Sequence, residues 1–191
     1  SAVLFGLRLR ERAMPSPELP VAVIGAGPVG LAAVARLLER GIEPLVFEAG
    51  ATVGASYVDF GHVRLFSPWR ANLDPCMAAM LAARGWTSPP DDELPLAGEV
   101  VRRVLEPFAA LPEVASRLRL RSKVMAITRE GHDKVLSAGR EAAPFVLLVE
   151  RDGVVEEYRA RAVIDASGTW QSPNPLGGNG LPALGEAQLA A

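Results

Sequence analysis

Residues 21–48, VAVIGAGPVGLAAVARLLERGIEPLVFE, decide the fold of this chain. A short apolar run at 21–24 predicts a strand that leads directly into the glycine-rich turn at 25–30. The apolar residues that follow the turn repeat with helical spacing and predict a helix that ends at Gly41: Leu31, Val34, Ala35 and Leu38. A second apolar run at 45–47 predicts another strand, which ends at Glu48.

The spacing of the glycines in this turn predicts nucleotide binding. Gly25 permits the tight turn, Gly27 lets the backbone approach a pyrophosphate, and Gly30 lets the helix lie close to the strand. The phosphates then meet the N–H groups and the positive dipole of a helix N-terminus, so no lysine is needed. Glu48 follows Gly30 by eighteen residues and is placed to accept hydrogen bonds from ribose hydroxyls. Its carboxylate would repel a 2′-phosphate, which favours FAD or NAD over NADP.

Composition limits the classes of function. The 191 residues, 49% of them hydrophobic, are enough for one core with room for a small subdomain. A net charge of −2 argues against nucleic acid and anionic membranes as partners, and no apolar run is long enough to span a bilayer. Cys76 is the single cysteine, so no internal disulfide or cysteine pair is expected, and the setting is predicted to be cytoplasmic. The two histidines, His62 and His132, form no metal-binding pattern.

The rest of the chain alternates between predicted elements and loops. Residues 1–20 are expected to be a disordered tail in which Met14 is a candidate natural start. Residues 62–66 alternate and predict a strand, residues 67–70 a turn or loop, and residues 86–95 a surface connection. Helices are predicted at 75–84 and 98–110, the second one bent near its end by Pro107.

The second half predicts a change of sheet type. Asp152-Gly153 is a strong hairpin signal between the apolar runs 145–150 and 154–159, and residues 123–128 supply a third strand. Residues 161–168 then predict a buried parallel strand beside the glycine-rich turn. The expected fold class is therefore α/β: a Rossmann-like parallel sheet with helices on both faces and an inserted small antiparallel β-meander.

These segments together resemble a known family. Residues 21–48, the Val124 strand, the meander and the run 166–169 (ASGT) followed by 173–177 (PNPLG) resemble the FAD-binding half of two-dinucleotide-domain flavoproteins. The likeness is greatest to flavin-containing monooxygenases and related NAD(P)H-dependent oxidoreductases. Residues 54–57 (GASY) depart from the family's frequent Gly-Gly-x-Trp, and no second glycine fingerprint follows a strand. The expected domains are a tail at 1–20, an FAD-binding domain at 21–176, and a linker or truncated start of a nicotinamide domain at 177–191.

The resemblance also implies which residues bind the cofactor, although it implies no catalytic residue and no metal. The turn would hold the pyrophosphate, Glu48 the adenosine ribose and the Val124 backbone the adenine edge, while Ser56 and Tyr57 approach the flavin. The full set of expected cofactor-binding residues is Gly25, Ala26, Gly27, Pro28, Val29, Gly30, Glu48, Ala49, Ser56, Tyr57, Val124, Ala166, Ser167 and Gly168. Weaker candidates for lining the active face are Ser67, Trp69, Arg70 and Asn72. For Trp69 a place in the core is favoured over a substrate pocket, and a stacked surface pair of Trp69 and Arg70 is an equal alternative to the active-face role.

The activity implied for a complete relative is reduction of FAD by NADPH or NADH, then reaction of the reduced flavin with oxygen and a small-molecule substrate. The alternatives are a relative of the pyridine nucleotide-disulfide reductases and a non-catalytic dinucleotide-binding module. The sequence leaves open the substrate, the choice between NADPH and NADH, and the oligomeric state. This chain alone is expected not to turn over with NADPH, because it shows one glycine fingerprint.

Overall fold

The computed structural model describes residues 18–172 and 174–189. A four-stranded sheet with the order β3-β2-β1-β7 lies at its centre, and all three neighbouring pairs of strands are parallel. Its strands are β1 (Val21–Ile24), β2 (Pro44–Phe47), β3 (Leu118–Arg119) and β7 (Ala162–Asp165). The chain moves from β1 outward to β3 and returns to the other side of β1 as β7. The strand order therefore reverses next to β1, which is where open α/β sheets bind their ligands.

Helix α1 (Pro28–Glu39) follows β1 across the glycine-rich turn, as predicted. Gly27 is its N-cap, and Pro28 occupies the first turn, where a missing N–H costs nothing. The helix is terminated by Gly41, the residue after the C-cap Arg40, which has a φ of 66°. The N–H of Gly41 donates to the Leu38 carbonyl, and the N–H of Ile42 donates to the Leu37 carbonyl. These two bonds form a Schellman motif, so the predicted end at Gly41 is confirmed.

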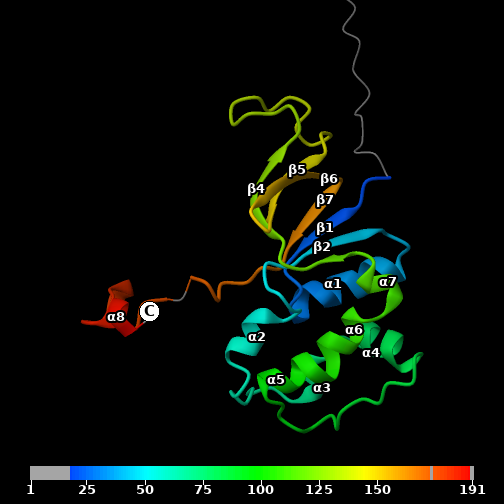
Figure 1. Ribbon diagram of the computed structural model, residues 1–191, viewed down its shortest axis with the longest axis vertical. Helices are drawn as coiled ribbons and strands as arrows, with labels where there is room; N and C mark the ends of the chain where they lie inside the picture. Colours follow the sequence, from blue (N-terminus) through cyan, green and yellow to red (C-terminus); the bar gives the residue numbers. More distant parts are fainter. Residues whose placement is uncertain (1–17, 173, 190–191) are drawn as a thin grey trace, which may run out of the picture.

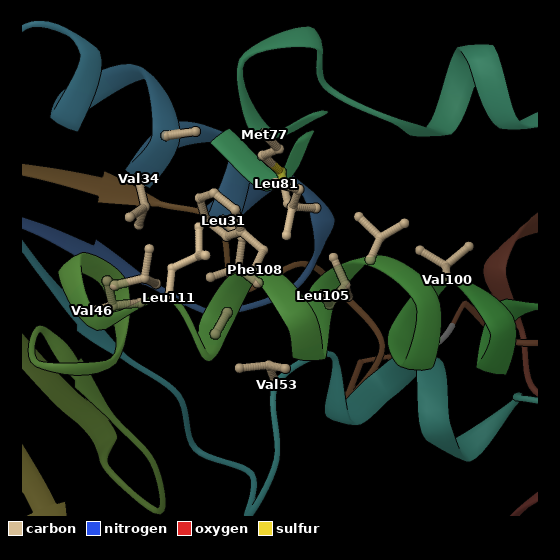
Figure 2. Close-up of a cluster of buried hydrophobic side chains, with 14 of the residues drawn as sticks. Leu31, Val34, Val46, Val53, Met77, Leu81, Val100, Leu105, Phe108 and Leu111 are labelled. Carbon is tan, nitrogen blue, oxygen red and sulfur yellow. The ribbon is translucent and has the colours of Figure 1, made fainter. Parts of the chain in front are cut away.

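The helices pack on one face of the parallel sheet (Figure 1). Alternate strand residues, Val23, Val46 and Ile164, point into this helical layer. The layer consists of α1, α4 (Pro75–Ala82), the helical segment from 97 to 109, and α7 (Pro112–Ala115). Figure 2 shows the buried side chains that join these elements: Leu31, Val34, Val46, Val53, Met77, Leu81, Val100, Leu105, Phe108 and Leu111.

The helical segment expected at 98–110 is present but is not regular. It consists of α5 (Ala97–Val100), a π-helical stretch η1 (Val101–Leu105) and α6 (Glu106–Ala109). Pro107 lies at the start of α6 and has no N–H to give to the Arg103 carbonyl one turn earlier. The indole Nε1 of Trp86 donates to that carbonyl instead, at 2.8 Å. The proline therefore changes the helix where predicted, and a side chain from a distant loop satisfies the freed acceptor.

The antiparallel meander is confirmed. It consists of β4 (Lys123–Arg129), β5 (Phe145–Arg151) and β6 (Val154–Ala160), in the order β4-β5-β6. Asp152 and Gly153 both have positive φ, 52° and 79°, as a two-residue type I′ hairpin requires. The inner face of the meander packs against Ala22 and Phe47, on the side of the parallel sheet opposite the helices. The expectation of helices on both faces is thus corrected: the meander covers the second face, because Leu147, Val149 and Ala160 supply the apolar surface that a helix would have given.

Several local predictions on the chain between 55 and 72 were wrong. Residues 62–66 are not a strand: beyond a single bridge between Arg64 and Leu96 they form turns, because none of the strands in the described part of the chain pairs with them. The expected loop at 67–70 runs into the short helix α3 (Trp69–Asn72), which follows α2 (Ala55–Asp59). Trp69 is buried in the core, so it does not form a surface pair with Arg70.

The ends of the chain complete the description. After β7 the chain leaves the two sheets and runs outward through η2 (Gly178–Gly180) to α8 (Glu186–Leu189) (Figure 1). Of the tail predicted at 1–20, residues 1–17 lie outside the described residues. Among the helices of residues 18–172 and 174–189, none has the length and apolar character that a membrane crossing requires.

Candidate dinucleotide-binding site

The glycine-rich turn lies at the carboxyl end of β1, between β2 and β7. Gly25 has a φ of 93°, and a Cβ added to it would lie 2.6 Å from the carbonyl oxygen of Ala166. A Cβ on Gly30 would lie 1.9 Å from the carbonyl oxygen of Gly25. Both glycines are therefore required by the protein's own packing, in the roles expected from the sequence.

Gly27 differs from the other two glycines of the turn. Its φ of −80° is one that any residue adopts, and no atom of the protein lies within 4 Å of a Cβ built on it. The protein's own packing therefore gives no reason for a glycine here. The space in front of the residue is open and faces the N-terminus of α1, where helix N–H groups lack partners within the helix. A backbone that must come close to a bound anion would explain the missing side chain.

Glu48 is buried at the end of β2, with 8% of its surface exposed. Its Oε2 accepts a hydrogen bond from the N–H of Ala26, and its Oε1 accepts one from the N–H of Gly50, both at 2.7 Å. The carboxylate thus ties the glycine-rich turn to the loop after β2. Each carboxylate oxygen can accept a further bond, so the ribose role expected from the sequence stays a prediction that this geometry permits.

The loop after β2 that contains Ala49 is held by the segment before β4. The N–H of Ser122 donates to the Glu48 carbonyl at 2.8 Å, and that of Arg121 donates to the Gly50 carbonyl at 2.9 Å. Val124 is the second residue of β4 and is half-buried against the second core. These bonds hold the start of β4 beside Glu48, and the contact of the Val124 backbone with the adenine edge stays a prediction.

The segment after β7 closes the other side of the turn. The N–H of Ala166 donates to the Ile24 carbonyl at 2.8 Å, so Ala166 extends the pairing of β7 with β1. The hydroxyl and N–H of Ser167 both donate to Oδ1 of Asp165, at 2.6 and 3.0 Å, and these bonds lower the pKa of Asp165. Gly168 follows with a φ of 70°, a conformation that favours glycine.

A cavity of about 380 Å³ adjoins the start of α1. Its lining includes Pro28 and Val29 from the turn, Tyr57 from α2 and Asn72 from α3. Asn72 is fixed because its Nδ2 donates to the carbonyls of Ser67 and Pro68, at 2.7 and 2.9 Å. Predicted site residues from three separate segments therefore meet at one cavity.

Other candidates lie apart from this cavity or do not line it. Ser56 shares α2 with Tyr57 but is not part of the lining. Trp69 lies in the core, and the guanidinium carbon of Arg103 is 5.4 Å from the centre of the Trp69 ring. Arg70 forms an ion pair with Asp92 on the surface. Ser67 contributes its carbonyl to Asn72.

Three residues near the site were not foreseen: Asp59, Phe60 and Trp170. The indole Nε1 of Trp170 donates to Oδ2 of Asp59 at 2.9 Å. The rings of Trp170 and Phe60 lie 4.9 Å apart, and those of Phe60 and Tyr57 lie 5.0 Å apart. These residues form an aromatic row from the cavity to the segment after β7. The only available sequence signal was a tryptophan shortly after the predicted strand end at 166–168.

Redox-active or metal-binding side chains are not gathered at this site. Cys76 is buried on α4, its Sγ is 3.5 Å from the Ala35 carbonyl, and burial raises the pKa of its thiol. Within the described part of the chain, no group of three or more metal-ligand side chains occurs. What the site offers is a recessed backbone, helix N–H groups, a buried carboxylate and a cavity, which together suit binding of a dinucleotide.

Comparison with known proteins agrees with this geometry. Residues 23–83 match the NAD(P)-binding Rossmann-like domain family. A search of curated proteins found no match. Among solved structures, bacillithiol disulfide reductase Bdr (YpdA) from Bacillus cereus is similar with a TM-score of 0.60 and 22% identity, over 84% of this chain and 42% of that protein.

Two further solved structures are similar to about the same degree. OTEMO in complex with FAD and NADP gives a TM-score of 0.57 and 22% identity over 80% of this chain and 26% of its own. An oxidized steroid monooxygenase bound to NADP gives a TM-score of 0.61 and 20% identity, over 78% of this chain and 26% of that protein. This chain therefore spans less than half the length of each of these proteins. Residues 23–83 are similar to the NAD(P)-binding Rossmann-like domain family, and about four fifths of the chain shares the fold of a region of these proteins.

Proposed function

We propose that this chain binds FAD and is the FAD-binding portion of an NAD(P)H-dependent flavoprotein oxidoreductase of the monooxygenase type. The observation that carries the proposal is the open position in front of Gly27, beside the N-terminus of α1 and the buried carboxylate of Glu48. Gly25 and Gly30 are explained by contacts within the protein, whereas Gly27 is explained by a ligand.

FAD rather than NAD is favoured by the second half of the chain. The meander covers one face of the parallel sheet, and β7 returns beside β1 so that Ala166 touches the glycine-rich turn. A plain dehydrogenase has no need of either feature. A solved protein of similar fold, OTEMO, was obtained with FAD and NADP. Glu48 disfavours a 2′-phosphate at this site, so NADP is not the proposed ligand of this turn.

The residues present have separate roles toward FAD. The turn and the start of α1 would receive the pyrophosphate, Glu48 the ribose, and the cavity beside Pro28, Val29 and Tyr57 would hold a further part of the cofactor. Bound FAD supplies the redox chemistry. This chain's own residues bind it, orient it and shield part of it from water, and none of them is assigned as an acid, base or nucleophile.

A disulfide reductase is the enzymatic alternative, favoured by the similarity to the Bacillus cereus reductase. Thiol chemistry requires an accessible thiolate. Cys76 is buried with a raised pKa, so it does not supply one. A reductase would need cysteines from outside this chain. A module that binds a dinucleotide without catalysis is the second alternative, and it predicts the same nucleotide but no transfer of electrons.

The nucleotide carried by the purified protein tests the proposal. We expect an absorbance spectrum with the bands of oxidised flavin, or their appearance when FAD is added and excess is removed. Denaturation should release FAD in a ratio to protein that approaches one. Release of NAD alone, or failure to retain added FAD, would contradict the proposal. Anaerobic addition of NADPH, with a nicotinamide-binding domain supplied beside this chain, then separates an enzyme from a non-catalytic module, because only the enzyme bleaches its flavin.

A further inference from the structure

The aromatic row from Tyr57 to Trp170 connects two segments that are far apart in the sequence. Asp59 and Trp170 are separated by 111 positions, yet the indole N–H of Trp170 donates to the Asp59 carboxylate. Phe60 lies between the Trp170 and Tyr57 rings, in tilted contact with both. Helix α2 and the segment after β7 are thereby joined by one hydrogen bond and two ring contacts.

The same two segments border the candidate site from different sides. On one side, Tyr57 lines the cavity beside Pro28 and Val29. On the other, Ala166 lies against the glycine-rich turn, close enough to exclude a side chain at Gly25. The segment from 166 to 172 therefore spans from the turn to α2, and Trp170 fixes its far end.

We propose that Asp59, Phe60 and Trp170 form a clasp that holds the segment from 166 to 172 on α2 and so keeps Tyr57 and the glycine-rich turn in the arrangement that binds the dinucleotide. Trp170 is a positioning residue in this proposal, since it does not line the cavity itself. Only the identity of the ligand rests on the function proposed above, because the contacts of the clasp are present in the protein without a bound ligand.

The surroundings of Trp170 favour a specific role over incidental surface contact. Its side chain is 48% exposed, so burial alone does not hold it in place. The hydrogen bond to a carboxylate gives it direction, and a ring pair contributes beyond its buried area. Without the clasp the segment would adopt more conformations, and the fraction of molecules ready to bind would fall.

Hydrogen exchange without added nucleotide tests the clasp directly. Trp170→Phe keeps a ring but removes the N–H, Trp170→Ala removes both, and Asp59→Ala removes the acceptor. Each should raise amide exchange in the segment 166–172, where the N–H of Ser172 donates to the Thr169 carbonyl, by about two- to tenfold, the range expected for one lost hydrogen bond. Unchanged exchange in all three variants would overturn the clasp.

Titration with FAD tests the positioning role. Asp59→Ala and Trp170→Ala should each weaken FAD affinity by about two- to tenfold, and the double variant should lose no more than Trp170→Ala alone, because Trp170→Ala already removes both the hydrogen bond and the ring contact. The matched controls are Asp92→Ala, which removes an exposed carboxylate from an ion pair with Arg70, and Phe66→Ala, which removes an aromatic ring that is 96% exposed. Both controls should leave exchange at 166–172 and FAD affinity unchanged.

The two measurements fail in different ways. Faster exchange with unaltered FAD affinity would refute the positioning role while leaving FAD binding intact. No FAD binding by the unmodified protein would refute the proposed function and the positioning role, while the exchange data would still decide whether the clasp exists. Equal losses in the control variants would overturn the assignment to Asp59 and Trp170.

Discussion

Replacing the three glycines of the turn one at a time should separate ligand binding from folding. Gly27→Val places a Cβ where no atom lies within 4 Å apart from those of the adjoining residues, at a φ of −80° and ψ of −173° that suit a β-branched residue. The folded protein should therefore keep its stability, or gain about 0.4–1 kcal/mol because the unfolded chain loses freedom. The new methyl groups would occupy the position proposed for the pyrophosphate.

The expected loss of affinity follows from the hydrogen bonds that the phosphate would no longer reach. Each bond from a backbone N–H to a charged oxygen contributes about 1.5–3 kcal/mol, so losing one weakens FAD binding by about ten- to a hundredfold. Losing two weakens it further. Gly25→Ala and Gly30→Ala should behave differently, since their Cβ atoms would meet carbonyl oxygens at 2.6 and 1.9 Å. These variants should be destabilised by about 1–3 kcal/mol or more.

Thermal or urea unfolding gives the stability of each variant, and fluorescence titration with FAD gives its affinity. Gly178→Val is the matched control, because a Cβ there also meets nothing within 4 Å and the residue lies in η2, outside the candidate site. Weak FAD binding with native stability in Gly27→Val, and native behaviour in Gly178→Val, would support the reasoning. Unchanged FAD affinity in Gly27→Val would refute it, because the nucleotide would then not lie on this turn.

Three further predictions concern other groups at or near the site. Glu48→Gln should weaken FAD binding and also destabilise the fold by about 1–3 kcal/mol, because one buried backbone N–H loses its acceptor; an unchanged urea midpoint would contradict this. Cys76 should react slowly with a thiol reagent near pH 8 in the native protein and rapidly in urea, since burial raises its pKa; rapid native labelling would show that the thiol is accessible. The hydrogen bonds from Ser167 lower the pKa of Asp165 in the folded state, so they contribute stability above the ordinary aspartate range that is lost as the pH falls through the lowered pKa. Ser167→Ala should therefore reduce the loss of stability at acid pH. An identical pH dependence of the free energy of unfolding in both proteins would argue against this role of Ser167.

The sequence determined the core of the fold because that core is built from local patterns. The strand, turn and helix at 21–39, the end at Gly41 and the strand that leads to Glu48 each depend on neighbouring residues, and the structure reproduces them. The meander was equally predictable, since the Asp152-Gly153 turn fixes two strands by its backbone conformation alone.

Prediction failed where the outcome depended on partners far away in the chain. Residues 62–66 alternate like a strand, but a strand needs a neighbour, and the fold places only a single bridge there. The surface pair of Trp69 and Arg70, one of the alternatives that the sequence left open, does not form, because the packing of the helical layer buries Trp69 as core filler. The π-helical stretch before Pro107 was not predicted either. The hydrogen bond from Trp86 to the Arg103 carbonyl depends on two distant segments that meet only in the folded chain.

The candidate site divides in the same way. Its glycines and Glu48 were identified from spacing, because the groups that contact a nucleotide at such a turn lie close together in the sequence. The sequence could not show that Glu48 ties the turn to the loop after β2, or that Asp59 and Trp170 meet across 111 positions. Hydrogen bonds and ring contacts of this kind depend on how the chain folds back on itself, and only the tertiary structure decides which distant side chains come within reach.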